Sequence, residues 1–225
     1  MPYADIVFPN NNEDELIAMA EKLGYRELCL TYSLEGYKNA GRYNPSARIR
    51  IHHGIIASPK DVQKARNKAD LVIVKTSEDT RETVEKYMPD IVIGMEDHKK
   101  RDSMHQRNSG LNEVICKIAK GKHVAYGISF AGINSLNHYQ PILGRIMQNL
   151  KLCKKYNCMV IVGSFAETAL DMRSPADIAS FLELLGMDAR SAKNALMNLP
   201  LIIERNRKIR QKKLIADGVE ITGDA

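Results

Sequence analysis

The 225-residue chain is 44% hydrophobic and 27% charged, which excludes wholesale disorder and suits one large core. Its net charge of +6 is unevenly placed, because the segment Glu204–Lys213 holds six cations and one anion. No apolar run approaches the roughly 18 residues of a membrane span, and the N-terminus lacks the pattern of a secretory signal, so we expect a cytoplasmic protein without a membrane partner.

Short β-branched runs alternate with helical patterns along almost the whole chain, which predicts parallel strands joined by crossover helices. The runs at 71–74, 91–93 and 159–162 are continuously apolar, as expected of strands covered on both faces. We expect strands at residues 5–8, 27–31, 48–56, 71–75, 91–95, 124–129 and 159–163.

Two of the intervening helices begin with the same capping pattern. Ser58 and Ser174 are each followed by proline at the first helical position and by aspartate three residues after the cap. Gly24 is a C-terminal stop for the first helix of the chain. We expect the other helices at residues 14–23, 79–86, 111–120, 139–156, 189–196 and 199–213.

Seven strands and eight helices favour a TIM-barrel-like (β/α) barrel, and an open doubly wound sheet is the alternative. The chain shows no internal repeat and no linker, so we expect one barrel domain over residues 1–225, with a basic C-terminal helix at about 199–213 and a frayed tail at 217–225. The loops at 33–47 and 96–110 are too long for tight turns, and such loops on a rigid barrel commonly carry function.

Neither a metal site nor a nucleophile pattern emerges from the sequence. His52 and His53 are adjacent in a strand, so their side chains point to opposite faces and cannot share one ion without a bulge. The other histidines lack H-x-H or H-E-x-x-H spacing, and Ser164 lacks the G-x-S-x-G context of a nucleophile. The cysteines form no CxxC pair, which indicates buried thiols in a reducing compartment. They are Cys29, Cys116, Cys153 and Cys158.

The loop at 96–112 is a candidate binding surface, because it leaves the end of a strand and enters the N-terminus of a helix, where free N–H groups favour an anion. Its polar residues can cap that helix, and its cations stand at the same point of the chain. The alternative is a solvated loop, since its charges nearly cancel. The candidate binding residues are Lys99, Lys100, Arg101, Arg107, Asn108, Ser109 and Asn112.

The basic segment follows the apolar run 199–203, which can dock on the barrel while the cations face outward. Arg205, Lys208 and Lys212 share one side of the predicted helix. We interpret the segment as a phosphate-binding surface, whose affinity depends on salt because bound phosphates release counterions. A helix that only aids solubility is the alternative. The other cations of this surface are Arg207, Arg210 and Lys213.

These motifs also carry a resemblance to a known family. The string Arg107-Asn108-Ser109-Gly110-Leu111-Asn112 is the most specific match. Further matches are Asp5-Ile-Val-Phe-Pro, Gly127-Ile-Ser129-Phe, Gly163-Ser164-Phe and Met172-Arg173-Ser174-Pro175. In this order, along nearly the whole chain, they resemble the archaeal ribonuclease P protein component 3 family, the relatives of the eukaryotic thirty-kilodalton subunit of ribonucleases P and MRP.

The resemblance implies a barrel related to the polymerase and histidinol phosphatase barrels. It also implies a subunit of ribonuclease P, the ribonucleoprotein that removes the 5′ leader of precursor tRNA endonucleolytically, with the RNA subunit as the catalyst. The implied partners are RNase P RNA, precursor tRNA, the component 2 protein in a heterotetramer, and other RNase P proteins. Arg173, in the last motif, joins the candidate binding residues.

The metal-dependent barrel cousins carry H-x-H in the first strand, where this chain has Asp5 and then Asn10–Asn12. We therefore expect no catalytic residue, metal or cofactor in this chain, and magnesium only for the RNA-based holoenzyme. One alternative is an autonomous metal-dependent phosphoesterase of that type, with His52, His98, His105 and Asp97 as ligands. Another is a basic protein associated with the ribosome.

Overall fold

A computed structural model describes residues 2–39, 48–76, 79–97, 102–103, 107–134, 139–216 and 219–220. Seven parallel strands form one sheet in the order of the chain. This confirms the predicted strands and their parallel connection. The strands are β1 (Ala4–Val7), β2 (Glu27–Ser33), β3 (Arg50–Ile56), β4 (Leu71–Lys75), β5 (Ile91–Ile93), β6 (Ala125–Ser129) and β7 (Val160–Gly163).

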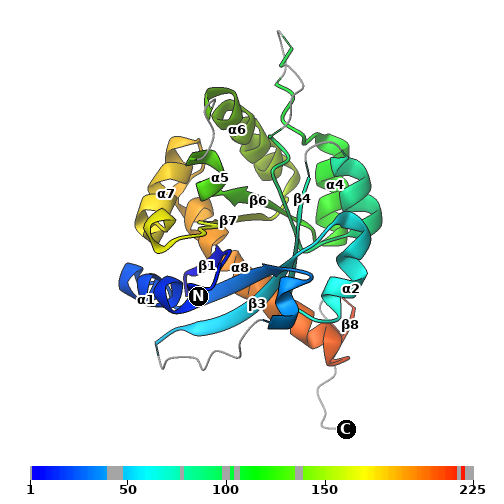
Figure 1. The fold of residues 1–225 in the computed structure, drawn as a ribbon. Coiled ribbons are helices and arrows are strands. Elements are labelled where there is room, and N and C mark those ends of the chain that lie inside the picture. The colour runs from blue at the N-terminus through cyan, green and yellow to red at the C-terminus, as the bar shows by residue number, and fades with distance from the viewer. Residues whose placement is uncertain are drawn as a thin grey trace.

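Helices surround this sheet, as the ribbon in Figure 1 shows. Thr83–Tyr87 adds a π-helical turn and Ala169–Asp171 a 3-10 turn, η4. No helix within the described residues is both long and apolar enough to cross a membrane. The α-helices are α1 (Glu13–Leu23), α2 (Val62–Arg66), α3 (Thr80–Glu82), α4 (Glu113–Lys122), α5 (Phe130–Asn134), α6 (Tyr139–Tyr156), α7 (Pro175–Leu184) and α8 (Ala189–Arg210).

The strands are apolar on both faces because each face packs against a separate core. In β4, Leu71 and Ile73 point into the barrel interior, while Val72 and Val74 pack outward with residues of α2. The continuous apolar runs in the sequence are therefore explained by burial on both sides, as expected for a parallel sheet covered by helices.

The barrel closes between its first and last strands. Val7 and Ala166 form a parallel bridge, and the N–H of Phe165 donates to the carbonyl of Ile6 at 2.7 Å. Asp5 lies beside this seam and accepts the N–H and the O–H of Ser164 at 2.6 and 2.7 Å. This closure decides between the two predicted architectures in favour of the barrel.

Helix α8 completes the interior. It packs against β7, β1 and β4 and passes behind β1 in Figure 1. Its residues Leu199, Ile202 and Ile203 belong to the same buried cluster as the inward side chains of the strands. Hydrogen bonds from Asn198 to the carbonyl of Val160 and from Asn206 to that of Asp70 place α8 across the end of the barrel where the strands begin.

Two expectations about the C-terminal region are wrong. The predicted helices at 189–196 and 199–213 are one helix, α8, with Pro200 inside it. The buried residues Leu196, Leu199 and Ile203 form one continuous stripe, so docking on the barrel outweighs the hydrogen bond that proline cannot donate. The tail is also not wholly frayed, because β9 (Val219–Glu220) pairs antiparallel with β8 (Leu214–Ala216); 217–218 and 221–225 lie outside the described residues.

Candidate nucleic-acid interface

The contacts of the string at 107–112 mainly stabilise the loop and the start of α4. Ser109 is buried, its Oγ accepts from Gln148 at 2.8 Å, and its carbonyl accepts from Asn149 at 2.8 Å. Asn112 caps α4 by accepting the N–H of Ile115 at 2.9 Å, which confirms the capping prediction. Burial of Ser109 corrects the expectation that it lies on a binding surface, and the capping bond already occupies the side chain of Asn112.

Position 110 of the same string requires glycine. Its φ of 81° lies in the left-handed region, and a Cβ there would collide with the carbonyl of Met95. The loop therefore crosses directly over the end of the β5 segment. Glycine is required by both the backbone angle and the close approach.

Arg107, Asn108 and Asn112 are the exposed members of the string, and of these Asn112 is the cap of α4. The Arg107 side chain is 51% exposed, lies against Gly144 of α6, and has a carboxylate oxygen of Asp102 at 3.9 Å from its Nη1. The side chain of Arg107 therefore does not fill the core. The predicted binding residues Lys99, Lys100 and Arg101 lie outside the described residues.

Asp102 fixes this loop to the barrel. It accepts the N–H of Asn108 at 2.9 Å and Nε of the buried Arg145 at 2.8 Å. Burial opposes ionisation of the carboxyl, but these hydrogen bonds and the neighbouring arginines outweigh it and lower the pKa of Asp102. The ion pair anchors the loop and leaves the guanidinium of Arg107 at the surface.

The basic segment at the end of α8 does not face outward as a whole. Arg207 and Arg210 both bind the carboxylate of Asp70, the residue before β4, and Arg207 does so at 2.7 Å. Burial alone would raise the pKa of Asp70, but the bonds from the two arginines lower it. Both guanidiniums are therefore engaged within the chain, which the sequence did not predict, because a carboxylate distant in sequence pairs with them; Arg210 nevertheless stays exposed.

The remaining cations of the segment differ in exposure. Arg205 is half-buried, and Lys208 lies 3.5 Å from Glu204. Lys212 and Lys213 are exposed, as predicted, but α8 ends at Arg210, so Lys212 does not share a helix face with Arg205. The outward positive charge is concentrated just beyond the end of the helix.

Arg207 also reaches the pair formed by His52 and Glu27. Its guanidinium lies 3.0 Å from Nδ1 of His52, and Nε2 of His52 lies 2.8 Å from Glu27. A guanidinium can only donate, so Nδ1 is the acceptor and Nε2 carries the proton that is donated to Glu27. His52 is a satisfied buried histidine near the strand starts, whereas Asp97 follows β5 at the opposite end, so these two residues of the phosphoesterase alternative do not meet.

Arg173 supports a turn of the main chain. Its Nη1 donates to the carbonyls of Leu170 and Met172 at 2.8 Å each, and its guanidinium lies 5.9 Å from the centre of the Phe130 ring. These contacts hold η4 against the start of α7. They leave Arg173 half-buried.

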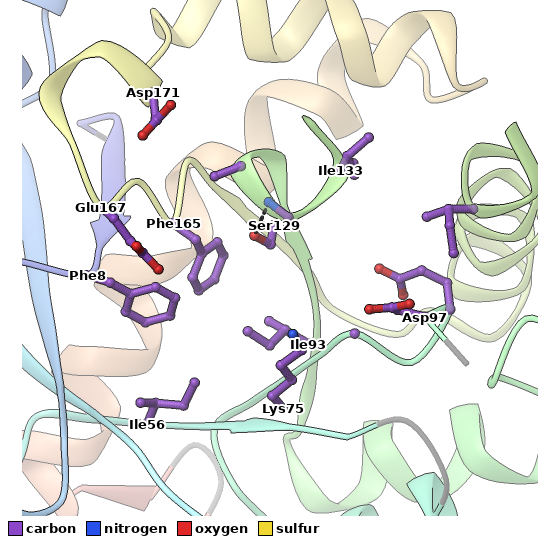
Figure 2. Close-up of a pocket in the computed structure, with 15 residues that line it drawn as sticks. Phe8, Ile56, Lys75, Ile93, Asp97, Ser129, Ile133, Phe165, Glu167 and Asp171 are labelled. Carbon is purple, nitrogen blue, oxygen red and sulfur yellow. Dashed lines mark hydrogen bonds between the residues drawn. The ribbon is translucent and has the colours of Figure 1, made fainter. Parts of the chain in front are cut away.

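The open end of the barrel, where the strands finish, holds a cavity of about 490 Å³ (Figure 2). Its apolar part includes Ile93 and the rings of Phe8 and Phe165, whose centres lie 5.4 Å apart. Lys75 enters from β4. The carboxylates that line it are Glu96, Asp97, Glu167 and Asp171.

Glu96 has the most altered environment in this cavity. Burial raises its pKa to about 7, against a hydrogen bond of 3.0 Å from the Tyr126 hydroxyl. Within the described residues, no three histidine, cysteine or acidic side chains are arranged to hold a metal ion. The carboxylates make the cavity unfavourable for a phosphate.

Sequence reasoning did not identify Lys75, Glu167 or Asp171, because none stands in a motif and only the barrel brings the strand ends together. A general signal existed: side chains just after parallel strands gather at one end of such a barrel. The prediction that the four cysteines are buried thiols is confirmed.

The chain resembles proteins of one family over nearly its whole length. A ribonuclease P protein component 3 from Methanococcus maripaludis is 25% identical over 84% of this chain and 83% of its own, and one from Methanococcoides burtonii is 27% identical over 94% and 88%. In the fold comparison, an archaeal ribonuclease P structure with mature tRNA matches with a TM-score of 0.77, 21% identity and 98% of each chain.

A histidinol phosphate phosphatase from Lactococcus lactis shares the fold more distantly, with a TM-score of 0.53 and 12% identity over 91% of this chain and 94% of its own. This likeness agrees with the predicted class of barrel. The sequence model for RNase P subunit p30 matches residues 4–212. The chain therefore belongs to the RNase P subunit p30 family.

Proposed function

We propose that this chain is a cytoplasmic protein subunit of ribonuclease P. It binds RNase P RNA and supports the removal of the 5′ leader from precursor tRNA, while the RNA subunit performs the cleavage. The family match over residues 4–212 carries the proposal. The relatives named ribonuclease P protein component 3 are matched over more than four fifths of their own length, which supports a shared role of the whole chain.

The distribution of charge separates surfaces that favour RNA from a cavity that does not. The strand-end cavity is lined by four carboxylates and one lysine, so it disfavours a phosphate backbone. Lys212 and Lys213 are exposed just beyond the C-terminus of α8. The side chain of Arg107 is exposed where it lies against α6. RNA contact is therefore assigned to the cationic surfaces, with Asn108 beside Arg107, and not to the cavity.

The proposal includes the component 2 protein as a direct partner, in a heterotetramer, alongside the other RNase P proteins. Magnesium serves the RNA of the holoenzyme and is not supplied by residues of this chain. A protein that neutralises phosphates lowers the concentration of cations that the RNA needs, because both act on the same charge.

Reconstituted cleavage of precursor tRNA tests the proposal. RNase P RNA and component 2 are assayed with and without this chain, at low and moderate magnesium. We expect the chain to raise cleavage most at low magnesium and to cleave nothing when the RNA is omitted. A cleavage rate that is the same with and without the chain, or nuclease activity of the chain alone, would overturn the proposal.

A further inference from the structure

A second cavity, of about 290 Å³, lies at the end of the barrel where the strands begin. Residues of α2, α4 and α8 surround it, together with the segments before β4 and β5. We name it the basal pocket. Its charged and polar lining consists of Arg66, Asp90, Lys122, His123, Arg205, Asn206 and Arg210.

The one carboxylate of the basal pocket is already engaged by the barrel. Asp90 is buried, and its Oδ2 accepts the N–H of Val72 at 2.7 Å. Asp90 has a pKa that is raised by burial, against the opposing influence of that hydrogen bond and of the charges of Arg66 and Arg205. It cannot neutralise the arginines and the lysine around the rim.

Two of the cations are partly engaged. Arg66 donates to the carbonyl of Met88, and Arg210 binds Asp70 outside the pocket. Lys122 is exposed and forms no ion pair with any residue that the structure describes. The buried Nε of Arg205 has no hydrogen-bond partner within the same residues. Lys122 and Arg205 are therefore the cations of the pocket that can still bind an anion.

Helix ends account for only part of this charge. α2, α4 and α8 end at Arg66, Lys122 and Arg210, and a helix C-terminus carries roughly half a negative charge, which attracts one cation. Arg205 stands a full turn before the end of α8 and is not needed for that purpose. With Arg210 paired to Asp70, the three other cations still exceed three half charges and the carboxylate of Asp90, so the pocket retains positive charge.

The size and composition of the pocket restrict the class of ligand that it can bind. Its volume is near the lower bound of about 300 Å³ for small-molecule sites, which suits one phosphodiester group. Among the described residues that line it there is no phenylalanine, tyrosine or tryptophan, so it lacks the large ring surfaces on which single-stranded bases commonly stack. Contacts to phosphate position an RNA without reading its sequence.

We propose that the basal pocket binds one backbone phosphate of RNA, with Lys122 and Arg205 as the contacting groups. The inference rests on the proposed function, because it assumes that the chain binds RNase P RNA. It adds the end of α4 to the RNA-binding surface. This places a contact on the end of the barrel opposite the acidic cavity.

The test compares Lys122→Ala with Lys120→Ala. Lys120 is also exposed near the end of α4 but does not line the pocket, so it controls for net charge. Affinity of the full chain for RNase P RNA is measured at several salt concentrations. Lys122→Ala should reduce the slope of log affinity against log salt by about 0.9 if the contacted RNA is helical and by about 0.7 if it is single-stranded.

The control should change that slope much less. If the wild type binds RNA and both variants give the same slope, the pocket is not a phosphate contact and only this inference fails. If the wild type itself does not bind RNase P RNA, the proposed function fails and the inference falls with it.

A titration with inorganic phosphate, followed by the NMR signal of the Arg205 Nε–H, examines the pocket without RNA. A shift of that signal in the wild type that is lost in Lys122→Ala and kept in Lys120→Ala supports the site. An unchanged signal, or a shift equal in both variants, overturns it.

Discussion

Replacing Asp5 by asparagine tests how the closure of the barrel depends on pH. Asp5 is fully buried, and its carboxylate accepts hydrogen bonds from Ser164 and from the N–H of Ile6 at 2.8 Å. Burial is the larger influence, opposed by these hydrogen bonds, and it raises the pKa from 3.8 to about 6. The folded protein therefore binds a proton at Asp5 more tightly than the unfolded chain does.

The sign of the effect follows from this difference. The stability contributed by Asp5 is fully present below pH 3.8, falls as the pH rises toward 6, and is constant above it. A rise of about two pKa units corresponds to about 3 kcal/mol. Asparagine keeps the shape of the side chain but does not ionise, so the variant lacks this pH-dependent loss.

Urea unfolding at pH 4, 5, 6 and 7, followed by circular dichroism, measures the effect. The free energy of unfolding of Asp5→Asn, taken relative to the wild type, should rise by up to about 3 kcal/mol across this range. The unpaired amide N–H₂ adds an offset that is the same at every pH. Asp14→Asn, at an exposed position of α1, is the control. Parallel pH curves for the Asp5 variant and the wild type would refute the reasoning.

Three further variants test the anchoring of the proposed binding surfaces. Asn112→Ala removes the cap of α4 and should lower the free energy of unfolding by about 1 kcal/mol, with an unchanged salt slope of RNA binding. Gly110→Ala should cost more than about 1 kcal/mol in chemical denaturation, because its Cβ meets the carbonyl of Met95 at a positive φ; an equal midpoint would contradict the close approach. Arg207→Gln should cost about 1–2 kcal/mol, allowing for its partial exposure, and should raise the pKa of Asp70, which NMR can follow.

The periodicity of the sequence located the strands well because both faces of each strand are buried. Leu71 to Val74 are all apolar since alternate residues serve the interior and the outer core. Periodicity failed at Pro200, where a local rule predicts a break but the buried stripe of α8 continues. It also missed the short helix α5 (Phe130–Asn134) directly after β6.

The sequence predicted the binding residues less well than it predicted the strands. The string at 107–112 was identified from its residues, yet Ser109 and Asn112 proved to anchor the loop. Ser109 is buried, and the exposed Asn112 uses its side chain to cap α4. Nothing local marks which polar residues a loop uses for its own hydrogen bonds. The partners Gln148 and Asn149 come from α6, far along the chain.

The sequence by itself determined the parallel strands, the buried thiols and the family, because these depend on local patterns of polarity and on motifs, whereas closure of the barrel was seen only in the tertiary structure. The tertiary structure alone decided where charge is exposed. Asp70 pairs with both Arg207 and Arg210 from more than 130 residues away, while Arg66, Lys122 and Arg205 meet around one cavity. Electrostatic energy depends on distance in space and on burial, and neither is a property of position along the chain.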